Sequence, residues 1–239
     1  MKKPANEATL TLTTIGFGAD DTHWHNETVF RLTQDRFAAL LTDHADPGHL
    51  GDRLLAAKRR NPGPYGFGVK SFVLSMIETA IEVTDGRVPA KVIADLMAAE
   101  RAMLAHPVEL LPHARDAVTA RARTHRIVLI TKGDLLDQER KLAQSGLGDL
   151  FHGVEIVSDK SPAVYAKLFA RHGTGASQAL IVGKSLKSDV LPVVAAGGHG
   201  VHVPHGQTWA LEHADPPARH ARFHSLADLA GLADLVARL

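Results

Sequence analysis

The sequence predicts an α/β fold in which a parallel, Rossmann-like sheet carries helices on both of its faces. From residue 106 onward, short apolar segments of strand length alternate with longer segments of helical periodicity. Such alternation is typical of parallel sheets, because each crossover between parallel strands needs a long connection, usually a helix. The stretch from residue 27 to residue 105 shows helical periodicity only. It therefore indicates a helical unit inserted after the first strand.

The first strand and the helical unit can be placed from local patterns. A strand is expected within residues 9–17, TLTLTTIGF, where many residues are β-branched. After a polar loop, residues 27–43 carry apolar side chains at three- and four-residue spacing, which predicts a helix. Residues 61–68, NPGPYGFG, form a loop rich in helix breakers. Two more helices are expected, at about 72–81 and at 89–104, the latter with a proline in its first turn.

Four further strands are expected after residue 105, with helices between and after them. Each strand is a short apolar segment, and several of the helices begin or end at recognisable signals. Serine followed by proline is a favourable N-cap and first-turn pair, and glycine often ends a helix. The strands are expected at 125–131, 154–158, 179–183 and 200–203, and the helices at 134–145, 161–173, 188–196 and 225–239.

Composition limits the classes of function. With 239 residues and 45% hydrophobic content, the chain can bury a full core. A net charge of +1 gives no basic excess for nucleic acid, and the basic run at 58–60, KRR, is expected to be a solvated helix face. Cysteine is absent, and neither a signal peptide nor an apolar membrane span is apparent. These features predict a cytoplasmic protein with a small-molecule substrate, and they leave open a monomer or a homodimer.

Polar side chains follow the expected strands at their carboxyl ends. Asp20 follows the first strand, Thr131 and Lys132 the second, Lys160 the third, and Asp189 the fourth. Ligands of parallel sheets lie beyond the carboxyl ends of the strands, so we expect these side chains to converge. Hydroxyl and ammonium donors suit a phosphoryl group, and carboxylates suit Mg²⁺. The sequence thus predicts a site for a phosphorylated metabolite at this edge of the sheet.

Four segments resemble, in order, the four motifs of the haloacid dehalogenase (HAD) superfamily of hydrolases. They are IGFGADDTHWHNE, LITKGD, SDKSP and VGKSLKSD. The resemblance covers residues 9–26 and 106–239 and implies a phosphatase-like HAD fold. It also places the inserted helices where this superfamily carries a helical C1-type cap, which acts as a lid. The expected domains are a core of residues 1–26 and 106–239 and a cap of residues 27–105.

The resemblance implies a role for each strand-end residue in Mg²⁺-dependent hydrolysis of a phosphomonoester. Asp20 matches the aspartate that acts as general acid and base and binds Mg²⁺ through its backbone carbonyl. Thr131, with Lys132 beside it, would bind the phosphoryl group. Lys160 would balance the charge of the nucleophile and the phosphate, and Asp189 would hold Mg²⁺. Side chains of the cap that face the pocket would choose the substrate.

Three positions near the expected pocket depart from the pattern of the family. Gly18 stands where the nucleophilic aspartate belongs, and glycine can form no aspartyl-phosphate. Lys184 stands where the family usually has aspartate or asparagine beside the metal, and its ammonium would repel Mg²⁺ and could pair with Asp189 or Asp20. His23 follows the motif threonine, where an apolar residue is usual. We therefore expect phosphatase activity to be lost or very low, and Mg²⁺ binding to be doubtful.

The departures, natural or engineered, leave three interpretations open. The first is a HAD phosphatase with little remaining activity. The second is a repurposed pocket in which His23 is the nucleophile or general base and acts on a small carbonyl compound or ester, assisted by Lys184 or Asp20. In that case Lys184 could also form a Schiff base. A solvated loop histidine explains His23 equally, and a salt bridge to a neighbouring carboxylate is the favoured explanation for Lys184. The third is a noncatalytic protein that binds phosphate or another anion through Thr131, Lys160 and Lys184.

Overall fold

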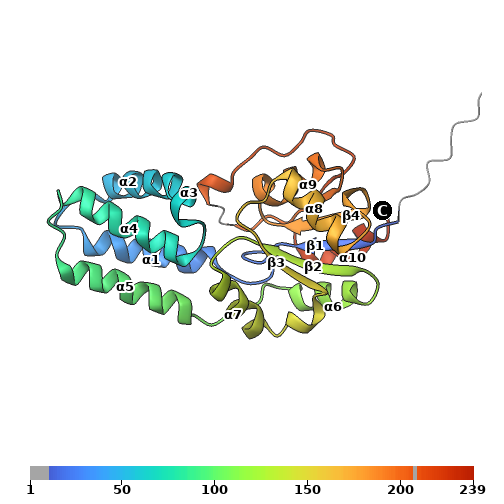
Figure 1. Ribbon diagram of the computed structural model, residues 1–239, viewed down its shortest axis with the longest axis horizontal. Helices are drawn as coiled ribbons and strands as arrows, with labels where there is room; N and C mark the ends of the chain where they lie inside the picture. Colours follow the sequence, from blue (N-terminus) through green and yellow to red (C-terminus); the bar gives the residue numbers. More distant parts are fainter. Residues whose placement is uncertain (1–10, 207–208) are drawn as a thin grey trace, which may run out of the picture.

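The computed structural model describes residues 11–206 and 209–239, and these residues form one parallel sheet of six strands surrounded by helices (Figure 1). The strand order is β3-β2-β1-β4-β5-β6. This arrangement confirms the predicted α/β, Rossmann-like fold. The strands are β1 Thr14–Phe17, β2 Arg126–Thr131, β3 Gly153–Ile156, β4 Ala179–Gly183, β5 His199–His202 and β6 Phe223–Ser225.

The central strand β1 explains where a ligand site can form. It pairs with β2 on one side and with β4 on the other, both in parallel. Every residue of β1 and β4 is buried, because helices cover both faces of the sheet. The strand order changes direction between β1 and β4, so the carboxyl ends of these two strands flank the crevice where parallel sheets bind ligands.

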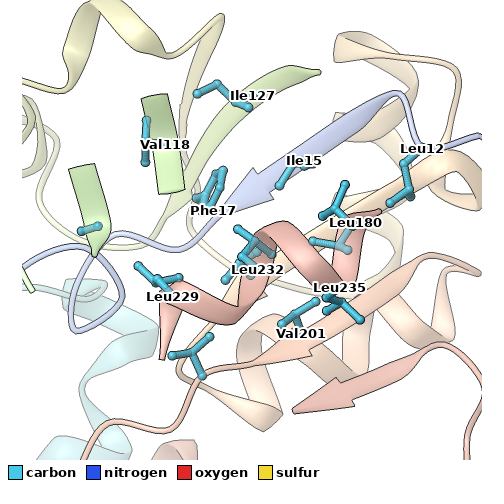
Figure 2. Packing of buried hydrophobic residues seen from close by; sticks show 14 of the residues in the cluster. Leu12, Ile15, Phe17, Val118, Ile127, Leu180, Val201, Leu229, Leu232 and Leu235 are labelled. Carbon is cyan, nitrogen blue, oxygen red and sulfur yellow. The ribbon is translucent and has the colours of Figure 1, made fainter. Parts of the chain in front are cut away.

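Helices cover the two faces of the sheet through separate apolar clusters. On one face, α6 (Ala114–Ala122) and α10 (Leu232–Val236) pack on Ile15 and Phe17 of β1, as Figure 2 shows. On the other face, α8 (Pro162–His172) and α9 (Leu191–Ala195) pack on Val128 and Ile181. The helix α7 (Leu135–Ser145) contacts Leu129 through Leu142. The burial of these apolar side chains on both faces is the main contribution to the stability of the sheet.

Five helices between β1 and β2 form a bundle beside the sheet, with an apolar cluster of their own (Figure 1). Asp46 caps one of them by accepting hydrogen bonds from the backbone N–H groups of Gly48 and His49. None of the helices in the described part of the chain is long and apolar enough to cross a membrane. The bundle consists of α1 Glu27–Leu40, α2 Pro47–Arg60, α3 Pro62–Tyr65, α4 Val69–Val83 and α5 Ala90–Ala105.

Several element boundaries differ from those predicted. A helix was expected over residues 225–239. Ser225 is instead the last residue of the strand β6, and the chain becomes α-helical only at Leu232. The helix α6 was missed because only Ala114 and Val118 of its residues are buried, which leaves little apolar periodicity. The helix expected at 188–196 begins with a π-helical turn at Leu186–Val190. The strand expected at 9–17 begins at Thr14, and residues 9 and 10 lie outside the described residues.

Candidate functional site

A pocket lies where the carboxyl ends of β1, β2 and β4 face the helical bundle. Its empty volume is about 980 Å³, open solvent at the mouth included. The walls come from the bundle and from the segment after β5, and they include the rings of Phe30, Phe67, Phe72 and Trp209. The structure brings together at the floor nearly every residue that the sequence predicts for the site. These are Gly18, Asp20, Thr131, Lys132, Lys160, Lys184 and Asp189.

Gly18 leaves space at the centre of this floor. Its backbone N–H donates to the carbonyl of Val182 at 2.8 Å, which continues the pairing of β1 with β4. A Cβ atom at this position would lie 3.0 Å from Thr22 Oγ1 and 3.5 Å from Asp189 Oδ2. The Thr22 hydroxyl is buried, and it has no hydrogen-bond partner among the described residues. A short side chain at position 18 would therefore fit against the floor once the Thr22 hydroxyl moves by a few tenths of an ångström.

Asp20 is held as a carboxylate by three side chains. Its Oδ1 accepts hydrogen bonds from Trp24 Nε1 at 2.9 Å and from Lys141 Nζ at 3.1 Å, and its Oδ2 accepts one from Gln138 Nε2 at 2.8 Å. Burial opposes the charge, but the Lys141 ammonium and the other two donors outweigh it and lower the pKa of Asp20. A carboxylate bound in this way is a poor general acid at neutral pH.

Lys184 pairs with Asp21, and not with Asp20 or Asp189 as predicted. The Asp21 side chain is fully buried, and it also accepts hydrogen bonds from the backbone N–H groups of Asn26 at 2.8 Å and Glu27 at 3.0 Å. Burial alone would lower the pKa of Lys184, but the Asp21 carboxylate raises it. The interpretation of Lys184 as an amine of lowered pKa, ready for Schiff-base chemistry, is therefore wrong.

Lys160 forms the second buried ion pair of the floor. Its Nζ donates to Asp189 Oδ1 at 2.6 Å, and both side chains are more than 90% buried. Asp189 also accepts hydrogen bonds from the backbone N–H of Ser185 at 3.1 Å and from the Tyr165 hydroxyl at 3.4 Å. An ammonium has three N–H donors, so Lys160 keeps donors for a ligand while it neutralises Asp189.

The donor set of the floor does not fit Mg²⁺. Gly18 supplies no carboxylate, and the Asp189 carboxylate, which would hold the metal, is bound to the Lys160 ammonium. The Lys184 ammonium adds a further positive charge at the same edge. No cluster of three or more His, Asp or Glu side chains in the described part of the chain could hold a metal ion. A hard cation needs several free oxygen ligands, and here one expected carboxylate is missing and the other is paired with a lysine.

His23 lies in the core and not in the pocket, so its interpretation as a nucleophile or general base is wrong. Its ring is fully buried and packs against the rings of Phe17, Trp24 and Phe151, with centroids 5.0 to 6.1 Å apart. Neither ring nitrogen has a hydrogen-bond partner among the described residues. Burial lowers the pKa of His23 to about 3, so the ring is neutral near pH 7.

Lys58 lines the pocket, which corrects the prediction that it belongs to a solvated helix face. Its Nζ lies 5.0 Å from the centroid of the Phe72 ring and 5.3 Å from that of Trp209. Burial lowers the pKa of Lys58, and the carboxylate of Glu27 opposes this effect. The ammonium and the rings thus form one wall, held together by cation–π contacts.

Glu212 enters the site from the segment between β5 and β6. Its Oε1 accepts a hydrogen bond from Lys132 Nζ at 3.0 Å, and its Oε2 accepts one from Ser185 Oγ at 2.6 Å. Burial opposes the charge, but the Lys132 ammonium and the hydroxyls of Ser185 and Ser188 lower the pKa of Glu212. This residue was not predicted, because it lies in an irregular segment outside the four motifs.

Gln138 and Lys141, which bind Asp20, were also missed. They lie three residues apart on α7 and therefore share one face of that helix. What distinguishes them is their burial in the middle of a polar helix, and this burial is visible only in the structure and not in the sequence.

No protein-family model matches the chain, and no curated protein is significantly similar to it in sequence. Among solved structures, a haloacid dehalogenase-like family hydrolase from Xanthomonas campestris superposes with a TM-score of 0.86 at 39% sequence identity, over 98% of this chain and 94% of the other. The HAD hydrolase YfnB from Bacillus subtilis, bound to magnesium, has a TM-score of 0.67 at 16% identity, over 95% and 99%. The L-2-haloacid dehalogenase from Xanthobacter autotrophicus, with chloropropionic acid covalently bound, has a TM-score of 0.65 at 16% identity, also over 95% and 99%.

Proposed function

The chain belongs to the haloacid dehalogenase-like hydrolase family, and from this premise we propose that it binds phosphate or another small anion in its pocket without catalysing hydrolysis. One observation carries the proposal. Position 18, where the family has its nucleophilic aspartate, is glycine, and the carboxylates around it are each neutralised by a lysine of the chain.

The floor lacks what hydrolysis through a covalent intermediate needs. Gly18 has no side chain that could attack phosphorus or carbon. Asp20 is bound by three donors that stabilise its ionised form, so it holds no proton for a leaving group. His23, the other candidate base, is walled off by aromatic rings. The same arguments weigh against ester hydrolysis and carbonyl chemistry in this pocket.

The floor keeps what anion binding needs. Thr131, Lys160 and Lys184 all line the pocket, and the Thr131 hydroxyl donates a long hydrogen bond of 3.2 Å to the Lys132 carbonyl that it can exchange for one to a ligand. Each of these two lysines has one ion-pair partner in the described part of the chain, which leaves N–H donors free for an oxyanion. We also propose that the helical bundle serves as the cap, because its Lys58, Phe30 and Phe72 close the pocket opposite the strand ends.

Titration of the full chain with inorganic phosphate tests the binding claim. We expect a saturable 1:1 isotherm by calorimetry. Thr131→Val removes the hydroxyl at nearly constant shape and should weaken binding about tenfold, as expected for one hydrogen bond to a charged group. Thr124→Val is the matched control, because Thr124 is exposed and lies before the amino end of β2, whereas the pocket lies at the carboxyl end. No binding by the wild type, or equal binding by Thr131→Val, would contradict the proposal.

A further inference from the structure

The segment that joins β5 to β6 places a carboxylate of the chain itself inside the pocket. Residues 209–222 lead to β6, and they begin with Trp209 and the short helix Ala210–Glu212. Trp209 reaches the bundle through its contact with Lys58. Glu212 points the other way, into the pocket, where its side chain is only 12% exposed.

Three polar side chains surround this carboxylate. Lys132 Nζ donates to Glu212 Oε1 and to Ser188 Oγ, both at 3.0 Å. Ser185 Oγ donates to Glu212 Oε2 at 2.6 Å, and it also accepts the backbone N–H of Ser188 at 2.9 Å. Lys132 follows β2, and the two serines follow β4, so the strand ends hold all three in place. Together they form a cradle for one carboxylate, with one ammonium and two hydroxyls.

We propose that Lys132, Ser185 and Ser188 form a subsite for the carboxylate of the bound molecule, and that Glu212 occupies this subsite until a ligand carboxylate replaces it. The inference rests on the proposed anion-binding function and names its ligand class. The exchange replaces one carboxylate by another, so Lys132 keeps a counter-ion throughout. Glu212 therefore acts as a built-in competitor that lowers the apparent affinity for every ligand that uses the subsite.

The surroundings of the subsite indicate the rest of the ligand. The ring of Phe67 lies 4.0 Å from Lys132 Nζ, directly beside the cradle. The rings of Phe30 and Phe72 follow in the same pocket, 5.0 Å apart between centroids. A carboxylate on Lys132 would place its attached carbon skeleton among these rings, where a flat apolar group packs best. The ligand class is thus a small monocarboxylate with an aromatic or similarly flat apolar body.

Benzoate is the probe for this inference, titrated by calorimetry into the full chain. Glu212→Gln removes the competing charge and should bind benzoate at least about tenfold more tightly than the wild type. Glu27→Gln is the matched control, because it removes one negative charge from the same pocket without vacating the subsite. It should tighten binding by less than about threefold, the effect of charge alone at a partly solvated site. Adding Lys132→Met to Glu212→Gln should reverse the gain.

Glu212→Asp provides a second variant that keeps the net charge and withdraws the carboxylate from Ser185. It should also tighten benzoate binding, and thermal unfolding of each variant shows that the fold is retained. Benzamide, which is neutral, should bind all variants equally. The inference is overturned if Glu212→Gln and Glu212→Asp bind benzoate no more tightly than Glu27→Gln does. In that case, phosphate binding by the wild type would still support the proposed function. If the wild type bound neither benzoate nor phosphate, the proposed function itself would be refuted.

Discussion

Replacing Gly18 with aspartate and Lys184 with asparagine is expected to raise the Mg²⁺-dependent hydrolysis of an aryl phosphate by at least about a thousandfold over the wild-type protein. Loss of a covalent nucleophile commonly costs several orders of magnitude in rate, so its return should recover a large part of this. The scaffold can accept the change if one side chain adjusts, because a Cβ at position 18 makes a tight contact of 3.0 Å with Thr22 Oγ1 and meets its next neighbour, Asp189 Oδ2, at 3.5 Å. The Thr22 hydroxyl has no hydrogen-bond partner among the described residues, and it can donate to the new carboxylate.

The second substitution addresses the charge of the floor. Lys184 is a protonated ammonium that lines the pocket beside Asp20 and repels a divalent cation. Its removal leaves Asp21 with the backbone N–H groups of Asn26 and Glu27, so this buried carboxylate keeps hydrogen-bond partners. We therefore expect Gly18→Asp alone to recover less activity than the double variant.

The rates are measured with 4-nitrophenyl phosphate, with and without Mg²⁺. Gly18→Asn/Lys184→Asn is the matched control, because asparagine has the shape of aspartate and cannot form an acyl phosphate. If the double variant with aspartate is no faster than this control, position 18 is not the site of the lost nucleophile.

Replacing His23 with leucine is expected to reduce the loss of stability that the protein undergoes as the pH falls below 6.5. The pKa of His23 is about 3 in the folded protein, against an ordinary value of 6.5, because burial excludes the charged ring. Below pH 6.5, the unfolded chain takes up a proton that the folded chain does not. The folded state therefore loses stability as the pH falls from 6.5 toward 3, by roughly 5 kcal/mol in total and by about 2 kcal/mol at pH 5.

Leucine at position 23 should also raise the stability at pH 7, where the His23 ring that it replaces is neutral. It removes two buried ring nitrogens that have no hydrogen-bond partner in the described structure, and each such group costs about 1–3 kcal/mol. Urea unfolding at pH 7 and pH 5 measures both effects. His49→Leu, at an exposed position on α2, serves as the control. An equal loss of stability at pH 5 in the wild type and in His23→Leu would contradict the burial of an uncharged ring.

Much of the fold follows from local patterns in the sequence. Both β1 and β4 are buried on both faces, so they are unbroken apolar segments that can be recognised without an alignment. The strand ends then place Thr131, Lys160 and Asp189 at one edge, because parallel strands point the same way. The short edge strand β6 has no such pattern, since all three of its residues are at least partly exposed.

The direction of His23 could not be predicted, because it depends on one turn. Asp21 has a φ of 53°, in the left-handed region, and its N–H donates to the carbonyl of Trp24. This tight turn carries position 23 back under the sheet edge, against Phe17 and Phe151. Glu212 escaped prediction for a related reason. Its position depends on the path of the long connection between β5 and β6, and such a connection has no periodic pattern in the sequence.

The most direct test of the central claim is the fate of an aryl phosphate in the presence of the wild-type protein. 4-Nitrophenyl phosphate is incubated with the full chain, with and without Mg²⁺, and the release of inorganic phosphate is followed over hours. Because Gly18 supplies no nucleophile and lysines neutralise the neighbouring carboxylates, we expect no release above the protein-free blank and full recovery of the ester. Release that rises with protein concentration and is lost in Asp20→Asn would contradict the claim.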